Sequence, residues 1–221
     1  CVNIPPRHGK SQLVSIYYPA WFLGRNPDKK VMMVSHTTDL AVDFGRKVRN
    51  LISTEEFKSI FPEVSLAVDS KSAGRWNTNF GGEYFACGIG SALAGRGADL
   101  LLVDDPHSEQ DVINGNFAVF EKAYEWFTFG ARTRLMPGGR VAIVQTRWHQ
   151  DDLSGRVIGD MVKNELSDQY EVVEFPAILD SEDADGKPVQ KPLWPEFFDL
   201  EALLRTKASM PAFQWNSQYQ Q

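Results

Sequence analysis

The feature that most constrains the fold is a series of short, continuous apolar runs that alternate with segments of helical periodicity. The runs lie in KKVMMVSH (29–36), DLLLVDDP (99–106), GGRVAIVQTRWH (138–149) and YEVVEFP (170–176). Apolar residues recur with helical spacing beside them, in residues 10–22, 39–52, 116–133 and 152–164. Apolar strands separated by helices are typical of a parallel sheet that is covered by helices on both faces. The sequence therefore predicts an α/β fold.

Two segments depart from this alternation. RWNTNFGGEYFACGIG (75–90) predicts a β-hairpin turned at Gly81-Gly82. DSEDADGKPVQKP (180–192) is rich in acidic residues, Gly and Pro, and predicts a polar loop. We take this loop as a boundary, with a core domain over residues 1–179 and a loop plus a small helical lid or linker over residues 180–221.

Composition and charge exclude several classes of protein. Cys1 and Cys87 are the only cysteines, too few for a disulfide scaffold or a cysteine-based zinc site. The apolar stretch 13–23 is too short to span a bilayer and contains Pro19, so we expect no membrane role. A net charge of −6 is unlike that of a protein that works mainly by gripping nucleic-acid phosphates, so any DNA contact should be local. Because the chain starts with Cys and enters its first motif at once, we expect an N-terminally truncated domain.

A phosphate-binding loop is indicated by IPPRHGKSQL (4–13). It contains Gly9-Lys10-Ser11, although Ile4 stands where the G-x-x-x-x-G-K-[ST] pattern has its first glycine. A strand before the loop and a helix after it are the context that such a loop requires. Backbone N–H groups would then face the β-phosphate of a bound nucleotide, while Lys10 reaches the β- and γ-phosphates and Ser11 offers its hydroxyl to Mg²⁺.

A pair of carboxylates ends the apolar run LLLVDD. Asp104 and Asp105 follow four apolar residues, at the carboxyl end of a predicted strand, where parallel α/β sheets bind ligands. A phosphate loop and an acidic strand end in one sheet hold Mg²⁺ from two sides, which is the constellation of P-loop NTPases. Asp104 would bind Mg²⁺, and Asp105 would orient or deprotonate the attacking water.

Four segments resemble motifs of the large terminase subunits of tailed bacteriophages. They are PPRHGKS (5–11), similar to the deviant Walker A motif of that family, GRGADLLLVDDPH (95–107), similar to its Walker B segment, VQTRWHQDDLSG (144–155), similar to the segment of its coupling motif, and LWPEFFDLEALLRTKASMPAFQWNSQYQQ (193–221), similar to the end of its ATPase region. The resemblance implies a P-loop NTPase of the additional-strand (ASCE) type. The strand 141–145 would lie between the strand 1–4 and the strand 100–103.

The resemblance also implies roles for individual residues. The nucleotide-binding residues would be Pro6, Arg7, His8, Gly9, Lys10, Ser11 and Gln12. Ser11 and Asp104 would hold Mg²⁺. Asp105 would be the general base, where many family members carry Glu. Thr146, or alternatively Gln145, would sense the γ-phosphate and couple hydrolysis to movement. Arg147 follows Thr146 where the family commonly has a small residue, so the register of this motif stays open.

Two arginines are candidates for stabilising the transition state. Arg96 lies between Gly95 and Gly97, a setting that lets an arginine finger reach a neighbouring subunit, and the resemblance favours that role. The alternative is that Arg96 only pairs with a local carboxylate such as Asp99. Arg7 could instead serve in cis.

The function that these expectations imply is ATP hydrolysis that drives double-stranded viral DNA into a preformed capsid. The expected partners are DNA, the portal protein, the small terminase subunit and further copies in a ring on the capsid. The expected location is the host cytoplasm during assembly rather than the finished virion. Endonuclease activity would belong to a C-terminal domain outside residues 1–221. Two alternatives are a P-loop helicase or remodelling ATPase, and a scaffold that binds nucleotide without hydrolysing it.

Overall fold

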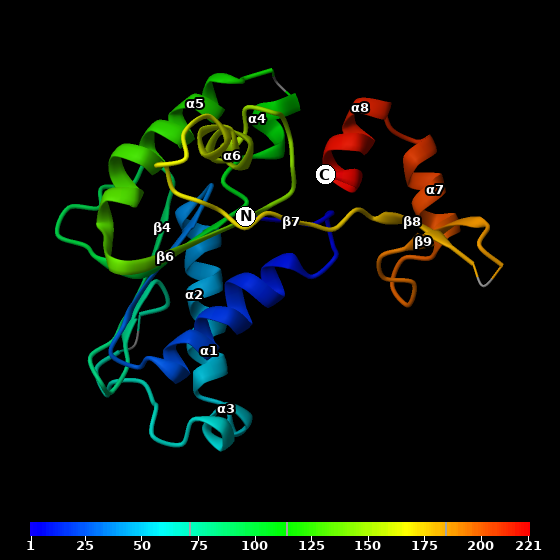
Figure 1. Cartoon of the computed structure of the whole chain (residues 1–221). Coiled ribbons are helices and arrows are strands. Elements are labelled where there is room, and N and C mark those ends of the chain that lie inside the picture. The colour runs from blue at the N-terminus through cyan, green and yellow to red at the C-terminus, as the bar shows by residue number, and fades with distance from the viewer. Residues whose placement is uncertain (71, 114, 184) are drawn as a thin grey trace. The chain divides into compact units, whose positions relative to one another are not determined.

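The computed structural model describes residues 1–70, 72–113, 115–183 and 185–221 (Figure 1). The chain forms two compact units, one of residues 1–10 and 145–221 and the other of residues 11–144. The domain boundary expected at residue 180 stays a prediction.

The unit of residues 11–144 contains most of a sheet. In an order in which neighbours are hydrogen-bonded to each other, the strands are β3 (Arg75–Asn77), β4 (Glu83–Gly88), β2 (Lys30–Ser35), β5 (Ala98–Asp104) and β6 (Leu135–Gln145). All neighbours are parallel except β3 and β4. The central strands β2 and β5 are buried almost throughout, as their apolar runs predict.

The other unit continues the sheet through the last residue of β6. Here β1 (Val2–Asn3) pairs in parallel with β7 (Val173–Glu174), and the Ile4 N–H donates to the carbonyl of Gln145 at 3.4 Å. The complete order is β3-β4-β2-β5-β6-β1-β7. The expected insertion of the strand 141–145 between the strands 1–4 and 100–103 is confirmed.

The sheet is mixed rather than purely parallel, which corrects the expected fold class. The cause is the predicted hairpin, which is confirmed with Trp76 opposite Tyr84 and adds β3 as an antiparallel edge strand. An antiparallel edge on a mostly parallel sheet is common, because a two-strand hairpin needs no crossover helix.

Helices on one side of the sheet form an extensive hydrophobic core with it. They are η1 (Gln12–Tyr17, a π-helix), α1 (Tyr18–Arg25), α2 (Thr38–Ile52) and α3 (Glu55–Ile60). Thr37 and Thr54 cap α2 and α3 by accepting from the N–H groups of Leu40 and Phe57. Residues of α1 and α2 pack against β2, β4 and β5, with Leu23, Met33, Val48, Tyr84 and Leu100 fully buried.

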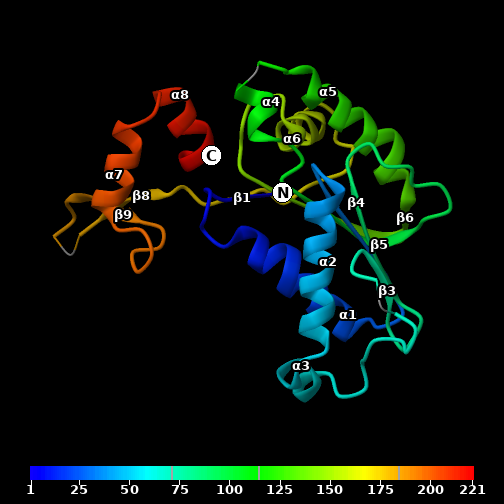
Figure 2. The same cartoon turned by 180° about the vertical axis from the view of Figure 1, so that it is seen from behind.

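The opposite side is covered by α5 (Ala118–Glu125), which continues into η2 (Trp126–Ala131) and η3 (Arg132–Arg134), after the short α4 (Glu109–Ile113) (Figures 1 and 2). The helix predicted over residues 116–133 is thus confirmed. It begins as an α-helix, continues as a π-helix and ends as a 3₁₀ helix.

The carboxyl-terminal part contains α6 (Leu153–Lys163), β8 (Ile178–Glu182), β9 (Pro188–Pro192), α7 (Leu200–Ala208), α8 (Ala212–Trp215) and η4 (Asn216–Gln220). The prediction of a polar loop over residues 180–192 is wrong, because β8 and β9 pair there as an antiparallel hairpin. A small core of Ala177, Ile178, Leu203 and Trp215 holds the predicted helical segment. Within the described parts of the chain, no helix has the length and apolarity needed to cross a membrane.

Candidate functional site

The loop that precedes η1 is curled by two residues with left-handed backbone. Arg7 has φ 64° and Gly9 has φ 81°, and the His8 N–H donates to the carbonyl of Pro5 at 3.4 Å. Glycine adopts such a φ without steric cost, which explains Gly9 before Lys10. Lys10 is buried and Arg7 is exposed. The loop therefore has the compact form that a phosphate cradle needs.

Aromatic residues of the carboxyl-terminal segment pack against this loop. The buried ring of His8 stacks on Phe198 with 5.0 Å between ring centroids, and its Nδ1 lies 2.9 Å from the Pro6 carbonyl oxygen. A Cβ added to Gly9 would lie 3.9 Å from the Trp194 ring. Residues 194–198 thus support the loop from within the same compact unit, a contact that the sequence did not reveal.

The helix after the loop reaches the acidic strand end. Ser11 is the N-terminal flanking residue of η1, and its side chain makes no capping hydrogen bond. Ser15, four residues later, donates its hydroxyl to Asp104 Oδ2 at 2.5 Å, and both residues are fully buried. That distance is typical of a charge-assisted O–H···O⁻ bond. Gln12 is exposed at the start of the helix.

The two aspartates have different environments. Asp104 ends β5 between Ser35 of β2 and Val144 of β6. Its charge adds to the effect of burial in raising the pKa of Tyr84. Asp105 is only partly buried and has left-handed backbone with φ 42°.

Three hydrogen bonds fix the backbone of Asp105. Its N–H donates to the carbonyl of Val144 at 3.0 Å, and its carbonyl accepts from the His36 N–H at 3.3 Å. The His36 Nδ1 also lies 3.2 Å from that carbonyl oxygen. Aspartate tolerates left-handed backbone better than most residues do. The chain is therefore turned directly after Asp104, and the turn is held from both neighbouring strands.

The end of β6 carries a buried amide. Gln145 is fully buried, and neither Oε1 nor Nε2 has a hydrogen-bond partner in the described part of the chain. Thr146 is also buried. Buried polar side chains are nearly always hydrogen-bonded, so an unpaired amide at a strand end points to a ligand or an ordered water.

Arg147 is occupied by a structural interaction. Its Nε lies 3.1 and 3.0 Å from the two carboxylate oxygens of Asp152, which is fully buried. Asp152 also accepts from the N–H groups of Trp148, His149 and Gly155, and so caps α6. Arg147 is therefore bound to the residue that caps α6.

Arg96 pairs with a carboxylate of its own chain. Its Nη1 lies 3.1 Å from Glu83 Oε1, and its guanidinium lies 4.4 Å from the centre of the Phe85 ring. Arg75 shares the same Glu83 oxygen at 3.2 Å. Asp99, the partner considered from the sequence, pairs with Lys29 instead at 3.3 Å. Gly95, the residue before Arg96, has a left-handed φ of 73°.

The predicted site residues fall into two groups. Pro6, Arg7, His8, Gly9, Lys10, Gln145 and Thr146 belong to one compact unit, whereas Ser11, Gln12, Arg96, Asp104 and Asp105 belong to the other. Within the second unit the structure joins the helix of Ser11 to Asp104 through Ser15. Arg96 is held at Glu83. Sequence reasoning missed Ser15 and His36, although the four-residue spacing from Ser11 to Ser15, one helical turn, was a usable signal.

The donor set fits a magnesium nucleotide. Mg²⁺ prefers oxygen ligands and is held by one or two protein groups together with phosphates and water. The hydroxyl of Ser11 and the carboxylate of Asp104, both in the unit of residues 11–144, are such groups.

Comparison with known proteins gives a consistent result. The family model described as "Terminase large subunit, T4likevirus-type, N-terminal" matches residues 1–217. A solved mutant of the large terminase ATPase domain of Thermus phage P74-26 is similar, with a TM-score of 0.56, 15% identity, and coverage of 99% of this chain and 86% of that chain. The ATPase domain without the mutation has a TM-score of 0.54, 16% identity and the same coverage. At these identities the likeness shows the fold alone. A search of curated proteins found no match.

Proposed function

The chain belongs to the terminase large-subunit family, in its N-terminal ATPase domain, and we propose that it hydrolyses ATP to move double-stranded DNA into a viral capsid. The observation that carries the proposal is the bond from Ser15 to Asp104. It joins the helix that follows Gly9-Lys10-Ser11 to the carboxylate at the end of β5. The hydroxyl of Ser11 and the carboxylate of Asp104, which would bind the metal, thus lie on two elements that this bond connects.

The first step is binding of the nucleotide phosphates by residues 6–12. The N–H groups of the curled loop and the ammonium of Lys10 bind the β- and γ-phosphates. Ser11 and Asp104 would hold a magnesium ion, which would neutralise charge at the phosphates. Ser15 keeps one oxygen of Asp104 in a fixed place, so the carboxylate needs little reorientation.

Asp105 acts on the attacking water. Its side chain is partly exposed while its backbone is fixed by Val144 and His36, so the carboxylate can accept a hydrogen bond from water at a defined place. General bases of this kind contribute roughly 10² to 10⁴ in rate. Gln145 and Thr146 then report the state of the γ-phosphate, because the unpaired amide of Gln145 gains a partner only when a ligand or water reaches it.

Arg96 serves as the finger of a neighbouring copy in a ring. In the structure Arg96 pairs with Glu83 and lies over the Phe85 ring, so this role requires the pair with Glu83 to open. Arg7, exposed in the loop, is the alternative in cis. Such fingers are worth roughly 10³ to 10⁵ in rate, so the isolated chain should be a slow ATPase. DNA, the portal protein and the small subunit are the expected partners of the assembled ring.

Turnover of ATP with and without duplex DNA tests the function. Lys10→Ala should abolish hydrolysis and weaken nucleotide binding. Asp105→Asn should bind MgATP normally and lose turnover, because asparagine keeps the shape and tolerates the same left-handed backbone. Lys163→Ala, which removes an exposed charge at the end of α6, is the matched control. Near-normal turnover in Lys10→Ala would exclude the P-loop mechanism. Tight MgATP binding without turnover in the parent chain would favour the scaffold alternative.

Mixing two inactive variants tests the role of Arg96. Arg96→Ala keeps the cradle and Lys10→Ala keeps the finger, so a mixed ring contains interfaces that combine an intact cradle with an intact finger. Activity should partly return in that mixture. A finger acting in cis cannot be rescued in this way, so absence of rescue in demonstrably mixed assemblies would assign the role to Arg7.

A further inference from the structure

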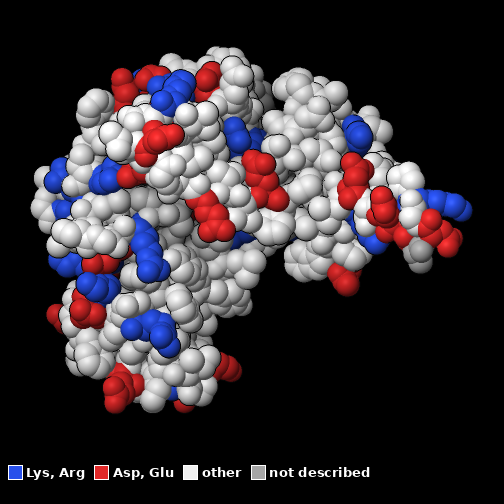
Figure 3. Space-filling view, viewed as in Figure 1, with Lys and Arg blue, Asp and Glu red and all other residues white. Residues whose placement is uncertain are grey.

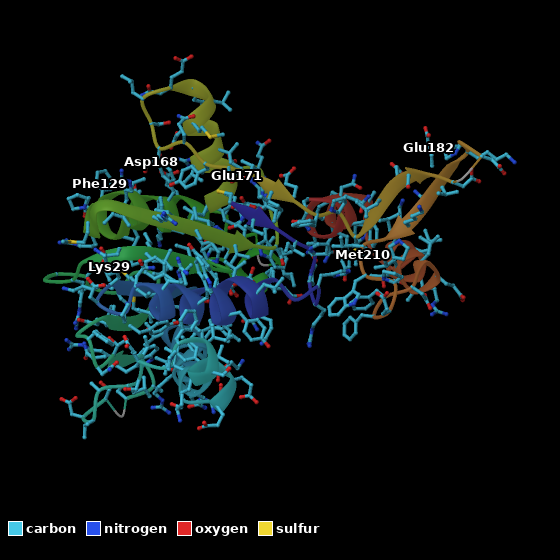
Figure 4. The ribbon with its side chains drawn as sticks, turned by 60° about the horizontal axis from the view of Figure 1, so that its bottom comes forward. Lys29, Phe129, Asp168, Glu171, Glu182 and Met210 are labelled. Carbon is cyan, nitrogen blue, oxygen red and sulfur yellow. The ribbon has the colours of Figure 1, made fainter. Side chains whose placement is uncertain are left out.

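A second concave site lies at the other edge of the sheet from Asp104, within the unit of residues 11–144. It is a cavity of about 340 Å³ beside the points where β2 and β5 begin. Its wall includes Trp21 and Arg25 of α1, Lys29 just before β2, Asp99 of β5 and Arg140 of β6. Figure 4 shows Lys29 at this end of the sheet. No step of the proposed ATPase mechanism uses these residues.

The cavity carries an excess of positive charge. Among the residues that the structure describes, Asp99 is the only acidic one in its wall. Its two oxygens are engaged, one by Lys29 Nζ at 3.3 Å and the other by the Lys30 N–H at 2.9 Å. Arg25 and Arg140 are exposed, and neither makes an ion pair or a side-chain hydrogen bond within the described residues. Two guanidinium groups are therefore available for an anion.

The positive charge of the cavity contrasts with the net negative charge of the chain. The protein carries a net charge of −6, and Figure 3 shows acidic and basic side chains interspersed over the face that it displays. Several cations on this surface have a carboxylate nearby, as Arg46 and Lys47 have in Asp43 and Lys58 has in Glu55. Two unpaired arginines that line one cavity thus form a local site for a strong anion.

Phosphate diesters are the anions that fit best. The planar fork of arginine donates two parallel hydrogen bonds to phosphate oxygens, and most protein–DNA hydrogen bonds go to the backbone. A flat aromatic ring beside the cations, Trp21 with half of its surface exposed, provides apolar area for sugar or base. A site of this kind binds without regard to sequence, as a translocating motor requires.

We propose that the cavity around Arg25 and Arg140 is a contact site for the phosphate backbone of duplex DNA. The choice of DNA as the ligand rests on the proposed function, whereas the presence of an anion site does not.

The site is connected to the acidic strand end by the sheet itself. Strand β5 runs from Ala98, next to Asp99, to Asp104, and β2 runs beside it from Lys30 to Ser35. Seven residues of strand span about 20 Å at roughly 3.3 Å per residue. Movement at Asp104 and Ser35 can therefore be passed to the DNA contact through strands that are buried along their length.

The test is equilibrium binding of a fluorescent 30-base-pair duplex, measured without nucleotide at several salt concentrations. Arg25→Ala combined with Arg140→Ala should weaken binding at low salt by about tenfold per arginine. A plot of the logarithm of the association constant against the logarithm of the salt concentration has a negative slope. The double alanine variant should make this slope less steep by about 1.8, at roughly 0.9 per lost phosphate contact. The matched control combines Lys163→Ala with Lys191→Ala, which removes two exposed positive charges outside the cavity. Arg25→Lys with Arg140→Lys should keep most of the salt slope.

A second readout is local to the site. The fluorescence difference between the parent and Trp21→Phe isolates Trp21 from the other five tryptophans, and this signal should change when DNA binds. Equal slopes in the alanine pair and its control would overturn the proposal, as would DNA binding without any change at Trp21. The first result would leave an acidic protein as the better ligand. Because no step involves ATP, failure of the proposed ATPase, tested with Lys10→Ala, leaves this outcome unaffected.

Discussion

Replacement of Ser15 by alanine tests the bond that anchors the candidate site. The Ser15 hydroxyl donates to Asp104 Oδ2 at 2.5 Å, and both side chains are fully buried. A hydrogen bond to a charged group contributes about 1.5 to 3 kcal/mol, and its loss leaves a buried carboxylate oxygen without that donor. We therefore expect Ser15→Ala to lower the free energy of unfolding by about 2 kcal/mol. For a chain of this length, that corresponds to a fall in melting temperature of about 4 to 8 °C.

Ser35 provides a matched control at the neighbouring position of the sheet. It lies opposite Asp104 on β2, is equally buried, and its Oγ has no hydrogen-bond partner among the residues that the structure describes. Ser35→Ala removes the same atom at the same depth without breaking a bond. It should be neutral or slightly stabilising, since an unpaired buried hydroxyl costs free energy.

Urea unfolding of both variants gives the measurement, and a double-mutant cycle of Ser15→Ala with Asp104→Asn gives the coupling. Neighbours in one hydrogen-bond pair show coupling energies of about 0.5 to 3 kcal/mol. Equal stability of Ser15→Ala and Ser35→Ala, or a coupling near zero, would refute the anchoring role of Ser15.

Three further predictions concern other parts of the molecule. Asp152→Ala should cost about 3 to 5 kcal/mol in urea unfolding, because it leaves the Arg147 guanidinium without its buried partner and removes the cap of α6; a loss below 1 kcal/mol would contradict this. Glu83→Gln should cost less than about 1 kcal/mol, as a partly exposed pair does, yet raise turnover of assembled rings by releasing Arg96; unchanged turnover would show that the pair does not restrain Arg96. Burial raises the pKa of the Cys87 thiol to about 11, so alkylation at pH 8, followed by peptide mass spectrometry, should be slow until the chain unfolds; rapid labelling of the folded chain would exclude the buried position.

The elements that were predicted are those whose signal is local. Continuous apolar runs predicted β2 and β5, and helical spacing of apolar residues predicted α2, because these patterns depend only on neighbours in the sequence. The end of β5 at Asp104 was predicted because the apolar run stops there at two carboxylates. The hairpin of β8 and β9 was missed since its residues are mostly polar and exposed, so no alternation of apolar side chains marks it.

The side-chain partners were less accessible to prediction. Arg96 pairs with Glu83 rather than Asp99 because β4 and β5 are both neighbours of β2, an arrangement that no local pattern contains. The pairing of Arg147 with Asp152 was also not predicted. The two residues are close in the sequence, but the four residues between them bring the side chains together in only some of their conformations.

Asp105 shows how a sequence departure and a backbone outlier can have one explanation. Many members of the resembled family carry glutamate at this place, and aspartate is one methylene shorter. In this chain the residue also leaves β5 with left-handed backbone, φ 42°, held by hydrogen bonds to Val144 and His36. Such backbone is tolerated at aspartate and asparagine far better than at longer side chains, so the turn and the shorter carboxylate suit each other. A strained conformation persists only where its surroundings fix it, and here two neighbouring strands do so. The local geometry therefore selects aspartate at the position where the proposed chemistry needs a carboxylate.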